Sequence, residues 1–435
     1  MSVKESIKKK YPGFVIWTHK VRGLAAYYIN GMPSKRLRVI GVTGTNGKTT
    51  TCYLITKILE EAGERVGMAS TTTFKIGAKE WVNRTNMTTM SPFALQSLLK
   101  KMVNAGCSYA VIETSSHSIA QYRNWGVRYY AAVMTNVTQY EHLDYHKDFE
   151  DYVKTKTKLF KTKPRVAVVN ADDPSAEKFL AFNAGQQLTY SQTKRADVTA
   201  RKVLPDRDGT IFTLVLPSGQ LTIDLHLPGL FNVSNALAAA SVGYGLKFPP
   251  EVIKKGLEAV KSIPGRMEKV EAGQDFTVMI DYAVTPDSLE KLYQTLRPGV
   301  KGKLIAVLGA TGDREKTKRP ILGAIAGRFA DLVVITDEDP YTEDPQEIIE
   351  QVAAGVPRGD KNKTMVLDED YFKILDRREG IKKALELAKR GDLVVITGMG
   401  AQEYRVVGKK HLPWSEKEVI KEELKKLGYN RKSKN

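Results

Sequence analysis

The chain is poor in cysteine and has no long apolar run. Its 435 residues include only Cys52 and Cys107, which excludes a disulfide framework and a cysteine-rich metal site. No apolar stretch approaches the roughly 20 residues that a membrane-spanning helix needs, and the first residues lack the apolar core of a signal peptide. These absences predict a soluble, cytoplasmic protein without a membrane span.

Acidic residues are too few to balance the basic ones. The chain has 67 lysines and arginines against 49 aspartates and glutamates, a formal net charge of +18. This excess suits a polyanion such as nucleic acid, anionic lipid or a phosphorylated substrate. The lysine clusters, in residues 8–10, 154–163 and 421–435, lack the aromatic interleaving of a single-strand binder. They predict a solvated basic face, and we expect no nucleic-acid partner.

Short apolar runs alternate with helical patterns from Leu37 onward, which predicts an α/β fold with largely parallel sheets. Between Asp197 and Leu227 the pattern alternates between apolar and polar residues and contains turn signals, which predicts an antiparallel edge. Pro264 and Gly265 then precede a second series of strands and helices. We therefore predict an N-terminal arm (1–36), a central P-loop ATPase domain with a mostly parallel sheet (37–262) and a C-terminal Rossmann-like α/β domain (263–435).

A glycine-rich turn between a predicted strand and a predicted helix is the strongest local signal. Residues 41–51 read GVTGTNGKTTT, after the apolar run RLRVI and before a helical pattern that ends near Gly63. In this context backbone N–H groups and the helix N-terminus bind phosphate. Lys48 would reach the β and γ phosphates of a nucleotide, and Thr49 would bind Mg²⁺. The spacing departs from a standard P-loop, because Val42 stands where its first glycine belongs.

A phosphate site also needs an acidic metal ligand, commonly at the end of a neighbouring strand. Glu113 follows the apolar run SYAVI and is the candidate. Three of the six histidines, His117, His142 and His146, lie within one short region near the ends of predicted strands. For His142 a ligand role and a structural role are both open, whereas the other two fit a structural role better.

A series of motifs in this order resembles the Mur ligase family, closest to its MurE branch, which joins an amino acid to a UDP-muramoyl-dipeptide. The motifs are GTNGKTT, ETSSH, TNVTQYEHLDYH, VVNADDP, FNVSNALAA, PGRME, DYAVTPDSLE, GATGDREKTKRP, TEDP and PWSEKE. The resemblance covers about residues 38–420 and accounts for the glycine spacing, since the family's loop reads GxxGTNGKT. It implies a ligase that uses ATP to phosphorylate a carboxylate, after which an amine attacks the acyl phosphate.

The same resemblance implies a set of site residues. Lys48, His142 and a carbamylated Lys156 would be catalytic, and a carbamylated lysine needs a desolvated, neutral amine. The nucleotide ligands that it implies are Gly44, Thr45, Asn46, Gly47, Lys48, Thr49, Thr50, Asn232, Asn235, Arg266 and Asp281. The ligands that it implies for two Mg²⁺ ions are Thr49, Glu113, His142 and Lys156. The substrate contacts that it implies are Ser115, Arg123, Asp313, Arg314, Glu338 and Tyr341.

Structural alternatives stay open for several of these residues. Lys156 has lysine neighbours and could be a solvated helix residue. The two asparagines could cap a loop, and Asp313 and Arg314 could serve helix capping equally well.

The chain also departs from the family's pattern. Only the arm precedes the ATPase strand, which leaves no room for the family's UDP-binding domain; a separate subunit, a substrate without UDP or a smaller ligand on the arm would each account for this. Members that select diaminopimelate carry DNPR, where this chain has EDPY from Glu338 to Tyr341. GMGAQ (398–402) replaces GKGHE, and Val284 replaces a histidine. An amine other than diaminopimelate is therefore favoured, and acidic Glu338 and Asp339 would suit a cationic one such as lysine, unless they cap a helix.

Three functions are compatible with these patterns. The first is an ATP-dependent amide ligase of MurE type in cell-wall peptide synthesis, acting on a small-molecule or peptide carboxylate and an amine. The second is a polyglutamate- or cyanophycin-like ligase. The third is a nucleotide-gated binding protein that has lost ligase activity, although a pure binder has no need of Glu113, His142 and Lys156 together.

Overall fold

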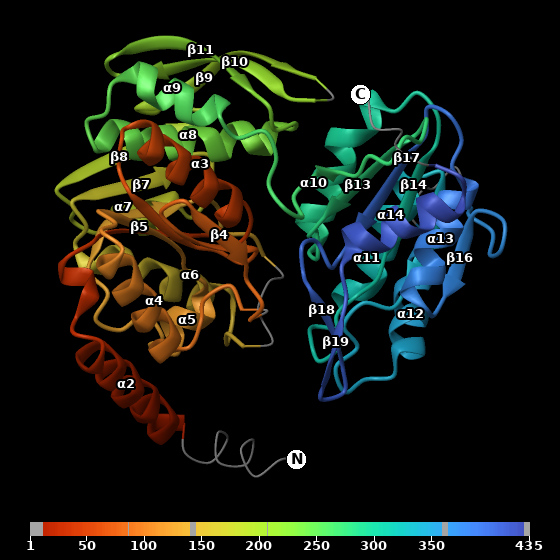
Figure 1. Cartoon of the computed structure of the whole chain (residues 1–435), viewed down its shortest axis with the longest axis horizontal. Helices are drawn as coiled ribbons and strands as arrows, with labels where there is room; N and C mark the ends of the chain where they lie inside the picture. The colour runs from red at the N-terminus through yellow and green to blue at the C-terminus, as the bar shows by residue number, and fades with distance from the viewer. Residues whose placement is uncertain (1–11, 86, 140–144, 207, 359–363, 430–435) are drawn as a thin grey trace.

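The chain folds into two α/β units, each built on its own sheet, which stand side by side (Figure 1). The structure is a computed structural model, and it describes residues 12–85, 87–139, 145–206, 208–358 and 364–429. The first unit ends with α9 (Pro250–Glu258) and the second begins with β12 (Glu268–Lys269). The architecture confirms the predicted α/β class, and the boundary predicted at residue 263 falls in the connection between the units.

The first unit has an eleven-stranded sheet with a parallel centre. The strand order is β11-β10-β9-β8-β7-β6-β1-β5-β2-β3-β4. The parallel strands are β1 (Arg38–Thr43), β2 (Val66–Ala69), β5 (Tyr109–Glu113), β6 (Tyr129–Met134), β7 (Val166–Asn170), β8 (Gln186–Ser191) and β9 (Val198–Pro205). The antiparallel strands at the two edges are β3 (Thr73–Ile76), β4 (Lys79–Val82), β10 (Thr210–Leu216) and β11 (Gly219–Leu225). The antiparallel edge predicted between residues 197 and 227 is thus confirmed.

Helices cover both faces of this sheet because its central strands present apolar side chains on both faces. In β1, Ile40 and Val42 face one core while Val39 faces the other. The first core is closed by α3 (Lys48–Glu61), α8 (Leu230–Gly245) and α9. The second is closed by α4 (Pro92–Asn104), α5 (Ser116–Ala120), α6 (Phe149–Thr157) and α7 (Ala176–Leu180).

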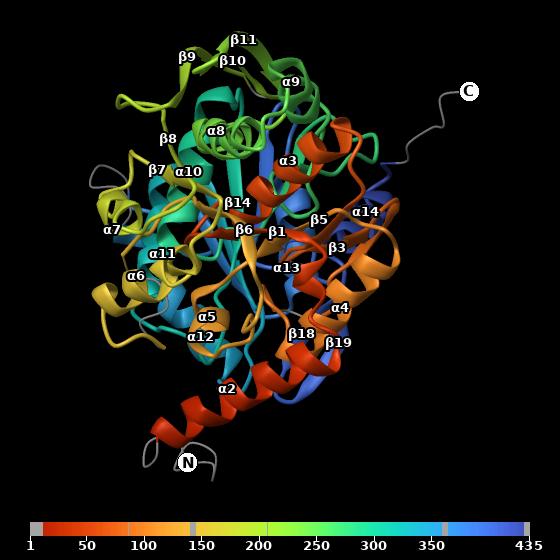
Figure 2. The ribbon, with the colours of Figure 1, turned by 90° about the vertical axis from the view of Figure 1, so that its left-hand side faces the viewer.

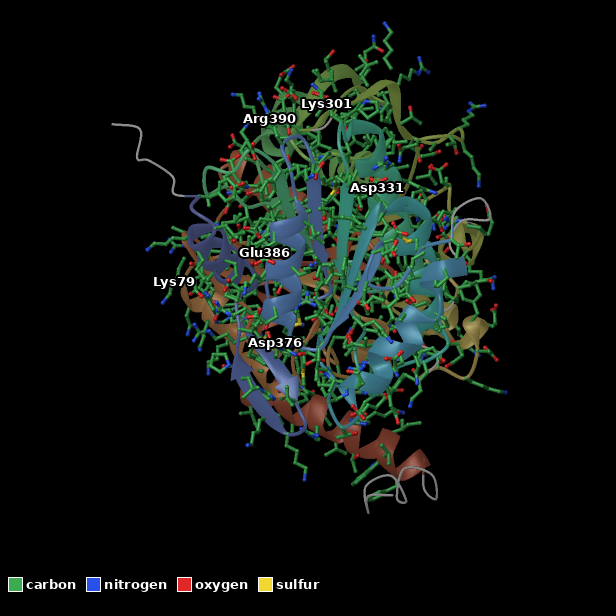
Figure 3. The ribbon with its side chains drawn as sticks, turned by 90° about the vertical axis from the view of Figure 1, so that its right-hand side faces the viewer. Lys79, Lys301, Asp331, Asp376, Glu386 and Arg390 are labelled. Carbon is green, nitrogen blue, oxygen red and sulfur yellow. The ribbon has the colours of Figure 1, made fainter. Side chains whose placement is uncertain are left out.

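The second unit has a six-stranded sheet in which five strands are parallel and β12 is antiparallel. The parallel strands are β13 (Thr277–Asp281), β14 (Leu304–Leu308), β15 (Leu332–Thr336), β16 (Tyr371–Ile374) and β17 (Leu393–Thr397). The helices are α10 (Pro286–Leu296), α11 (Lys318–Phe329) and α12 (Pro345–Ala353) on one face, with α13 (Arg377–Leu387) and α14 (Glu416–Lys426) on the other. A hairpin of β18 (Tyr404–Val407) and β19 (Lys410–Pro413) extends from it. Figure 3 shows α13 on the outer face, with its N-cap Asp376 at one end and Arg390 beyond the other.

The predicted N-terminal arm contains a helix, α2 (Pro12–Ile29), at the edge of the first unit (Figure 2). Ala26 and Tyr27 are buried against the body, and Gly23 meets Trp125 so closely that a Cβ would lie 2.7 Å from the Trp125 side chain. Four short 3₁₀ turns are η1 (Pro33–Lys35), η2 (Phe160–Thr162), η3 (Arg297–Gly299) and η4 (Val356–Arg358). No helix in the described residues combines the length and the apolar character needed to cross a bilayer.

The parallel register decides where a site can form. Val42 of β1 pairs with Glu113 of β5, and Thr43 pairs with Met134 of β6. The loops that follow these three strands therefore open at one edge of the sheet, where α/β proteins bind their ligands.

Candidate active site

The loop between β1 and α3 is held in a shape that requires its glycines. Gly47, the N-cap of α3, has a φ of 81°, which other residues rarely adopt. A Cβ on Gly47 would lie 2.2 Å from Asn235 Oδ1, and one on Gly44 would lie 1.8 Å from Thr135 Oγ1. The GxxGTNGKT spacing is therefore the spacing that this loop needs to pass between the β6 loop and α8.

The segment after β6 fixes the loop through hydrogen bonds to the backbone of the loop. Thr45 N donates to Asn136 O at 2.8 Å, and Asn46 N donates to Asn136 Oδ1 at 2.9 Å. Thr135 Oγ1 donates to Asn46 O at 2.7 Å. Asn136 is a positioning residue that the sequence analysis did not single out, although its motif, TNVT, was recognised.

Lys48 and Thr49 are the first two residues of α3, and their polar groups lie beside the glycine loop. Lys48 Nζ donates to Thr45 O at 2.7 Å, and Thr49 Oγ1 donates to Glu113 Oε2 at 2.9 Å. Glu113 is only 2% exposed. Thr71, which the sequence analysis missed, donates to Glu113 from its backbone N and its Oγ1, each at 2.8 Å.

This donor set fits Mg²⁺. A hydroxyl and a carboxylate meet beside the phosphate loop, and Mg²⁺ in nucleotide sites takes one or two protein oxygens and completes its shell with phosphate oxygens and water. Within the described residues no group of three or more His, Cys, Asp and Glu side chains is arranged to hold a metal. The pair Thr49 and Glu113 is thus suited to an ion that a bound nucleotide helps to hold.

Lys156 lies in α6 and points at the glycine loop. Its side chain is 1% exposed, and Nζ donates to Gly44 O at 2.7 Å. The same nitrogen lies 4.5 Å from the centre of the Tyr152 ring, whose hydroxyl is 3.0 Å from Thr45 Oγ1. This burial excludes the alternative of a solvated helix lysine.

The predicted histidine cluster is described only in part, because His142 lies outside the described residues. The His117 ring centre lies 4.3 Å from that of Tyr145 and 6.0 Å from that of His146. Burial, reinforced by the nearby His146 and Arg314, lowers the pKa of His117 to about 4. His117 is therefore a neutral imidazole at neutral pH.

Acid should destabilise the fold through His117. Because its pKa is about 4 in the folded chain and about 6.5 in an unfolded one, the unfolded state takes up a proton first as pH falls. The contribution of His117 to the free energy of unfolding is fully present above pH 6.5. As pH falls through 6.5 toward and below about 4, the free energy of unfolding decreases by an amount of order 3 kcal/mol. Urea unfolding at several pH values should show a flatter profile for His117→Asn than for the exposed His411→Asn; equal profiles would contradict this assignment.

The two predicted adenine ligands lie inside α8 rather than in a loop. Asn232 and Asn235 are each 5% exposed, and Asn235 Nδ2 donates to Asn232 Oδ1 at 3.0 Å. Asn232 Nδ2 also donates to Pro228 O at 2.8 Å, so a capping role applies to this residue. Asn235 borders Gly47, so one of the predicted adenine ligands lies against the glycine loop. Thr50 is buried on α3.

The second unit reaches the glycine loop directly. Arg266 Nη2 donates to Thr49 Oγ1 at 3.2 Å. Asn46 Nδ2 donates to Asp287 Oδ2 at 2.8 Å, and Asp287 is a further residue that the sequence analysis missed. Asp281 accepts a hydrogen bond from Met267 N at 2.8 Å, and burial raises its pKa to about 6 despite the opposing charge of Arg266. Phosphate-loop groups and residues 266–287 thus form one site.

Ser115 and Arg123 are brought together through Thr89. Ser115 is the N-cap of α5, and Thr89 Oγ1 donates to Ser115 Oγ at 3.4 Å. Arg123 Nη1 donates to Thr89 O at 2.8 Å, while Gln121 Oε1 accepts from Nε and Nη2. Burial lowers the pKa of Arg123, which keeps its usual positive charge at neutral pH.

Asp313 and Arg314 belong to a loop that packs on the segment around Tyr341. Thr342 Oγ1 donates to Asp313 Oδ1 at 2.8 Å, and the Arg314 guanidinium lies 5.8 Å from the centre of the Tyr341 ring. Helix capping is wrong for both residues, because the N-cap of α11 is Thr317. Since Arg314 also acts on the pKa of His117, this loop faces the first unit.

Glu338 and Asp339 are buried side by side, each 4% exposed. Thr311 Oγ1 donates to Glu338 Oε1 at 2.6 Å, and Val406 N donates to Asp339 Oδ1 at 2.7 Å. Burial raises both pKa values, that of Asp339 to about 6. The helix-cap interpretation is wrong for this pair, because the N-cap of α12 is Asp344.

Two family models match the chain. One describes the Mur ligase middle domain and matches residues 42–243, and the other describes the Mur ligase glutamate ligase domain and matches residues 265–400. The chain belongs to the Mur ligase family. The resemblance found in the sequence motifs is thereby confirmed, and this Mur ligase is an ATP-dependent enzyme that joins a carboxylate to an amine.

The sequences of two relatives align with most of this Mur ligase. The UDP-N-acetylmuramyl-tripeptide synthetase of Roseiflexus sp. (strain RS-1) is 42% identical over 421 residues, which are 93% of this chain and 81% of the relative. A UDP-N-acetylmuramoyl-L-alanyl-D-glutamate–2,6-diaminopimelate ligase of Caldanaerobacter subterraneus subsp. tengcongensis is 38% identical over 420 residues, 95% of this chain and 84% of the relative.

Solved structures share the fold. A UDP-N-acetylmuramoyl-L-alanyl-D-glutamate–2,6-diaminopimelate ligase matches with a TM-score of 0.63 at 30% identity. The match covers 94% of this chain and 84% of the ligase chain. The folylpolyglutamate synthase of Mycobacterium tuberculosis in complex with ADP matches with a TM-score of 0.71 over 94% of each chain, but at 18% identity this likeness concerns the fold alone.

The hydrogen bond between Asn46 and Asp287 predicts that a variant without the Asp287 carboxylate binds ATP more weakly. Asp287→Ala removes the bond that ties the second unit to the loop, so we expect KM for ATP to rise about tenfold while kcat falls less. Phosphate release measured against ATP concentration tests this. Glu290→Ala on the same helix, where Glu290 pairs with Arg328 on the surface, is the control. A fall in kcat with KM unchanged would contradict it.

Proposed function

We propose that this Mur ligase adds an amino acid to the carboxylate of a muramoyl peptide, in cell-wall peptide synthesis. The names of its relatives support this assignment, at 42% and 38% identity over nearly the whole chain. The observation that carries it is the meeting of both units at the phosphate loop, through Arg266 and Asp287. A reaction between an activated acid and an amine needs such a closed, water-excluding site, because water would hydrolyse the acyl phosphate.

The residues at the loop supply charge neutralisation and alignment. Lys48, Arg266 and the first backbone N–H groups of α3 surround the position of the phosphates and offset the negative charge that gathers during phosphoryl transfer. Thr49 and Glu113 would hold Mg²⁺, which neutralises phosphate charge when bound. Ser115 and Arg123 are proposed to hold the acid substrate, since Arg123 keeps its positive charge and both residues bond to Thr89.

We further propose that Lys156 is carbamylated in the active enzyme. Carbamylation joins the neutral amine of the lysine to carbon dioxide, releases a proton and gives an anionic ligand. The 1% exposure of Lys156 and its position beside the glycine loop, 2.7 Å from Gly44 O, support the proposal, because a carbamate needs a desolvated amine next to the site that it serves. A carbamate there would offer oxygen atoms beside the phosphate loop for a second Mg²⁺.

For the amine substrate we propose an amino acid with a cationic side chain, such as lysine. Glu338 and Asp339 are buried with raised pKa values, so an entering cation would be stabilised by their ionised forms. Tyr341, whose ring lies against Arg314, stands where members of the family that select diaminopimelate have an arginine. A phenol lacks the charged fork that grips a second carboxylate.

We place the enzyme in the cytoplasm. Cys52 and Cys107 are buried free thiols, and free thiols persist in a reducing compartment. The comparisons lend no support to a separate UDP-binding subunit, and the proposal includes none.

The test incubates the pure protein with ATP, Mg²⁺, a UDP-muramoyl dipeptide and a panel of amines, with mass spectrometry of the product. We expect phosphate release only when acid and amine are both present, with kcat/KM for lysine at least about tenfold above that for diaminopimelate. Glu338→Gln should remove most of this preference, because a neutral amide attracts the ammonium group less. Release with folate and glutamate alone would instead support a polyglutamate ligase, and ATP binding without turnover would support a binding protein.

A further inference from the structure

Helix α2 is apolar on two faces, only one of which is covered. The covered face packs on the body through Gly23, Ala26 and Tyr27. The second face is a stripe of five exposed side chains that follow one another at spacings of three and four residues. They are Phe14 (57% exposed), Trp17 (58%), Val21 (41%), Leu24 (39%) and Tyr28 (59%). These spacings place the stripe along one side of the helix, and the helix itself lies at the edge of the molecule (Figures 1 and 2).

The charged residues in the sequence of the arm from residue 6 onward have a single sign. Residues 6–36 contain no aspartate or glutamate but seven lysines and arginines. Lys20 and Arg22 lie on α2 itself and, at 3.6 residues per turn, fall on opposite flanks of the stripe. Lys20 Nζ lies 5.1 Å from the centre of the Tyr122 ring on the body side.

A basic surface continues from the end of α2. η1 packs on α4, as α2 does, and leads into a cavity of about 710 Å³ at the N-terminal ends of β1, β6 and β7. The cavity is lined by Lys35, Arg36, Arg38, Arg128, Lys163 and Arg165. Glu64 is its only acidic lining residue, and the described part of the chain shows no ion pair for any of the six cations.

The composition of the stripe identifies the kind of surface that would cover it. Aromatic side chains with an apolar body, flanked by basic residues, are typical of helices that lie in the interface of an anionic bilayer. A second copy of the helix fits less well, since a paired seam places the flanking residues of two helices close together. Here the flanks offer Lys20 and Arg22 without any carboxylate to pair with.

We propose that α2 docks this enzyme on the surface of an anionic lipid bilayer. The helix lies parallel to the surface, the stripe from Phe14 to Tyr28 enters the headgroup region, and Arg22 together with the basic cavity residues contacts lipid phosphates. This inference does not depend on the assigned reaction, because none of these residues belongs to the active site.

The experiment measures flotation of the full chain with vesicles of phosphatidylcholine alone or mixed equally with phosphatidylglycerol. We expect binding only to the anionic vesicles, weakened by salt because exposed charges are screened. Trp17→Ser with Leu24→Ser, and separately Arg22→Glu with Arg36→Glu, should each lower the partition coefficient by at least about tenfold.

Matched controls make comparable substitutions at exposed positions far from the stripe. Leu204→Ser with Ile211→Ser changes two exposed apolar residues on β9 and β10, and Lys301→Glu with Arg390→Glu makes the same charge change on the second unit (Figure 3). Both should bind like the parent, and all four variants should keep its melting temperature and its phosphate release with soluble substrates.

Three outcomes overturn the proposal. The first is a parent chain that does not bind anionic vesicles, and the second is a stripe variant that binds them as tightly as the parent. The third is a dimer in sedimentation that the stripe variant abolishes while no form binds vesicles, which would assign the stripe to a second copy.

Discussion

Lys48→Ala is expected to reduce phosphate release by about 1000-fold or more, with the fold intact. Lys48 begins α3 at the phosphate loop, and its Nζ lies 2.7 Å from Thr45 O, within the loop itself. Lys48 is the only lysine in residues 41–51, and Arg266 reaches Thr49 from another segment, so the variant loses the one cation that the loop itself supplies. The effect should fall on kcat as well as on KM, since negative charge gathers as the phosphoryl group moves. Release of phosphate under saturating substrates measures it.

Lys57→Ala is the matched control for this prediction. Lys57 lies on the same helix and pairs with Glu60 at the surface, at 2.7 Å, a contact that contributes little to stability. Its variant should keep parental activity and melting temperature. If Lys48→Ala retained more than about a tenth of the parental rate, the assignment of this loop to phosphoryl transfer would be wrong, given the size of such contributions.

The phosphate loop could be predicted because its determinants are local. Gly44 and Gly47 are required by the backbone conformation and the close contacts of the loop. The apolar strand before them and the helix after them are recognisable in the same short stretch of sequence. The position of Glu113 followed from a second local rule, that a polar residue after a buried strand lies at the ligand-binding edge. Both rules held because the sheet is parallel at β1 and β5.

The partners of these residues could not be predicted in the same way. Thr71, Asn136 and Asp287 come from three separate segments. Thr71 donates two hydrogen bonds to Glu113, whereas Asn136 and Asp287 bond to Asn46 of the glycine loop. Which threonine, asparagine or aspartate takes such a place depends on strand order, here β6-β1-β5-β2, and on how the second unit meets the first. Neither is encoded in the spacing of a motif.

The arm shows what chain length alone leaves out. Residues 1–36 are too few for a domain, and the structure adds that Pro12–Ile29 form a helix. The helix α2 has a second apolar face, which blurs the single-stripe pattern expected of a surface helix. The feature that hid the helix is thus the same one that indicates a further binding surface.

Lys156→Ala should lower turnover by about 100-fold or more, because it would remove the carbamate that we propose as an anionic ligand next to the phosphates. The side chain is 1% exposed and reaches Gly44 O at 2.7 Å, so its removal leaves a space directly beside the glycine loop. Lys154→Ala, an exposed position on the same helix, is the control and should behave like the parent. Phosphate release and melting temperature are measured for both variants.

Chemical rescue separates a carbamate from an ordinary buried lysine. If Lys156 serves as a carboxylate-like ligand, acetate or formate added to Lys156→Ala should restore at least about tenfold in rate, since a small acid can occupy the space that the side chain leaves. Lys48→Ala should gain nothing, because the group lost there is a cation. Labelled bicarbonate should give a carbamate carbon signal in the parent that Lys156→Ala lacks. Full activity of Lys156→Ala without any added acid would remove the carbamate from the mechanism.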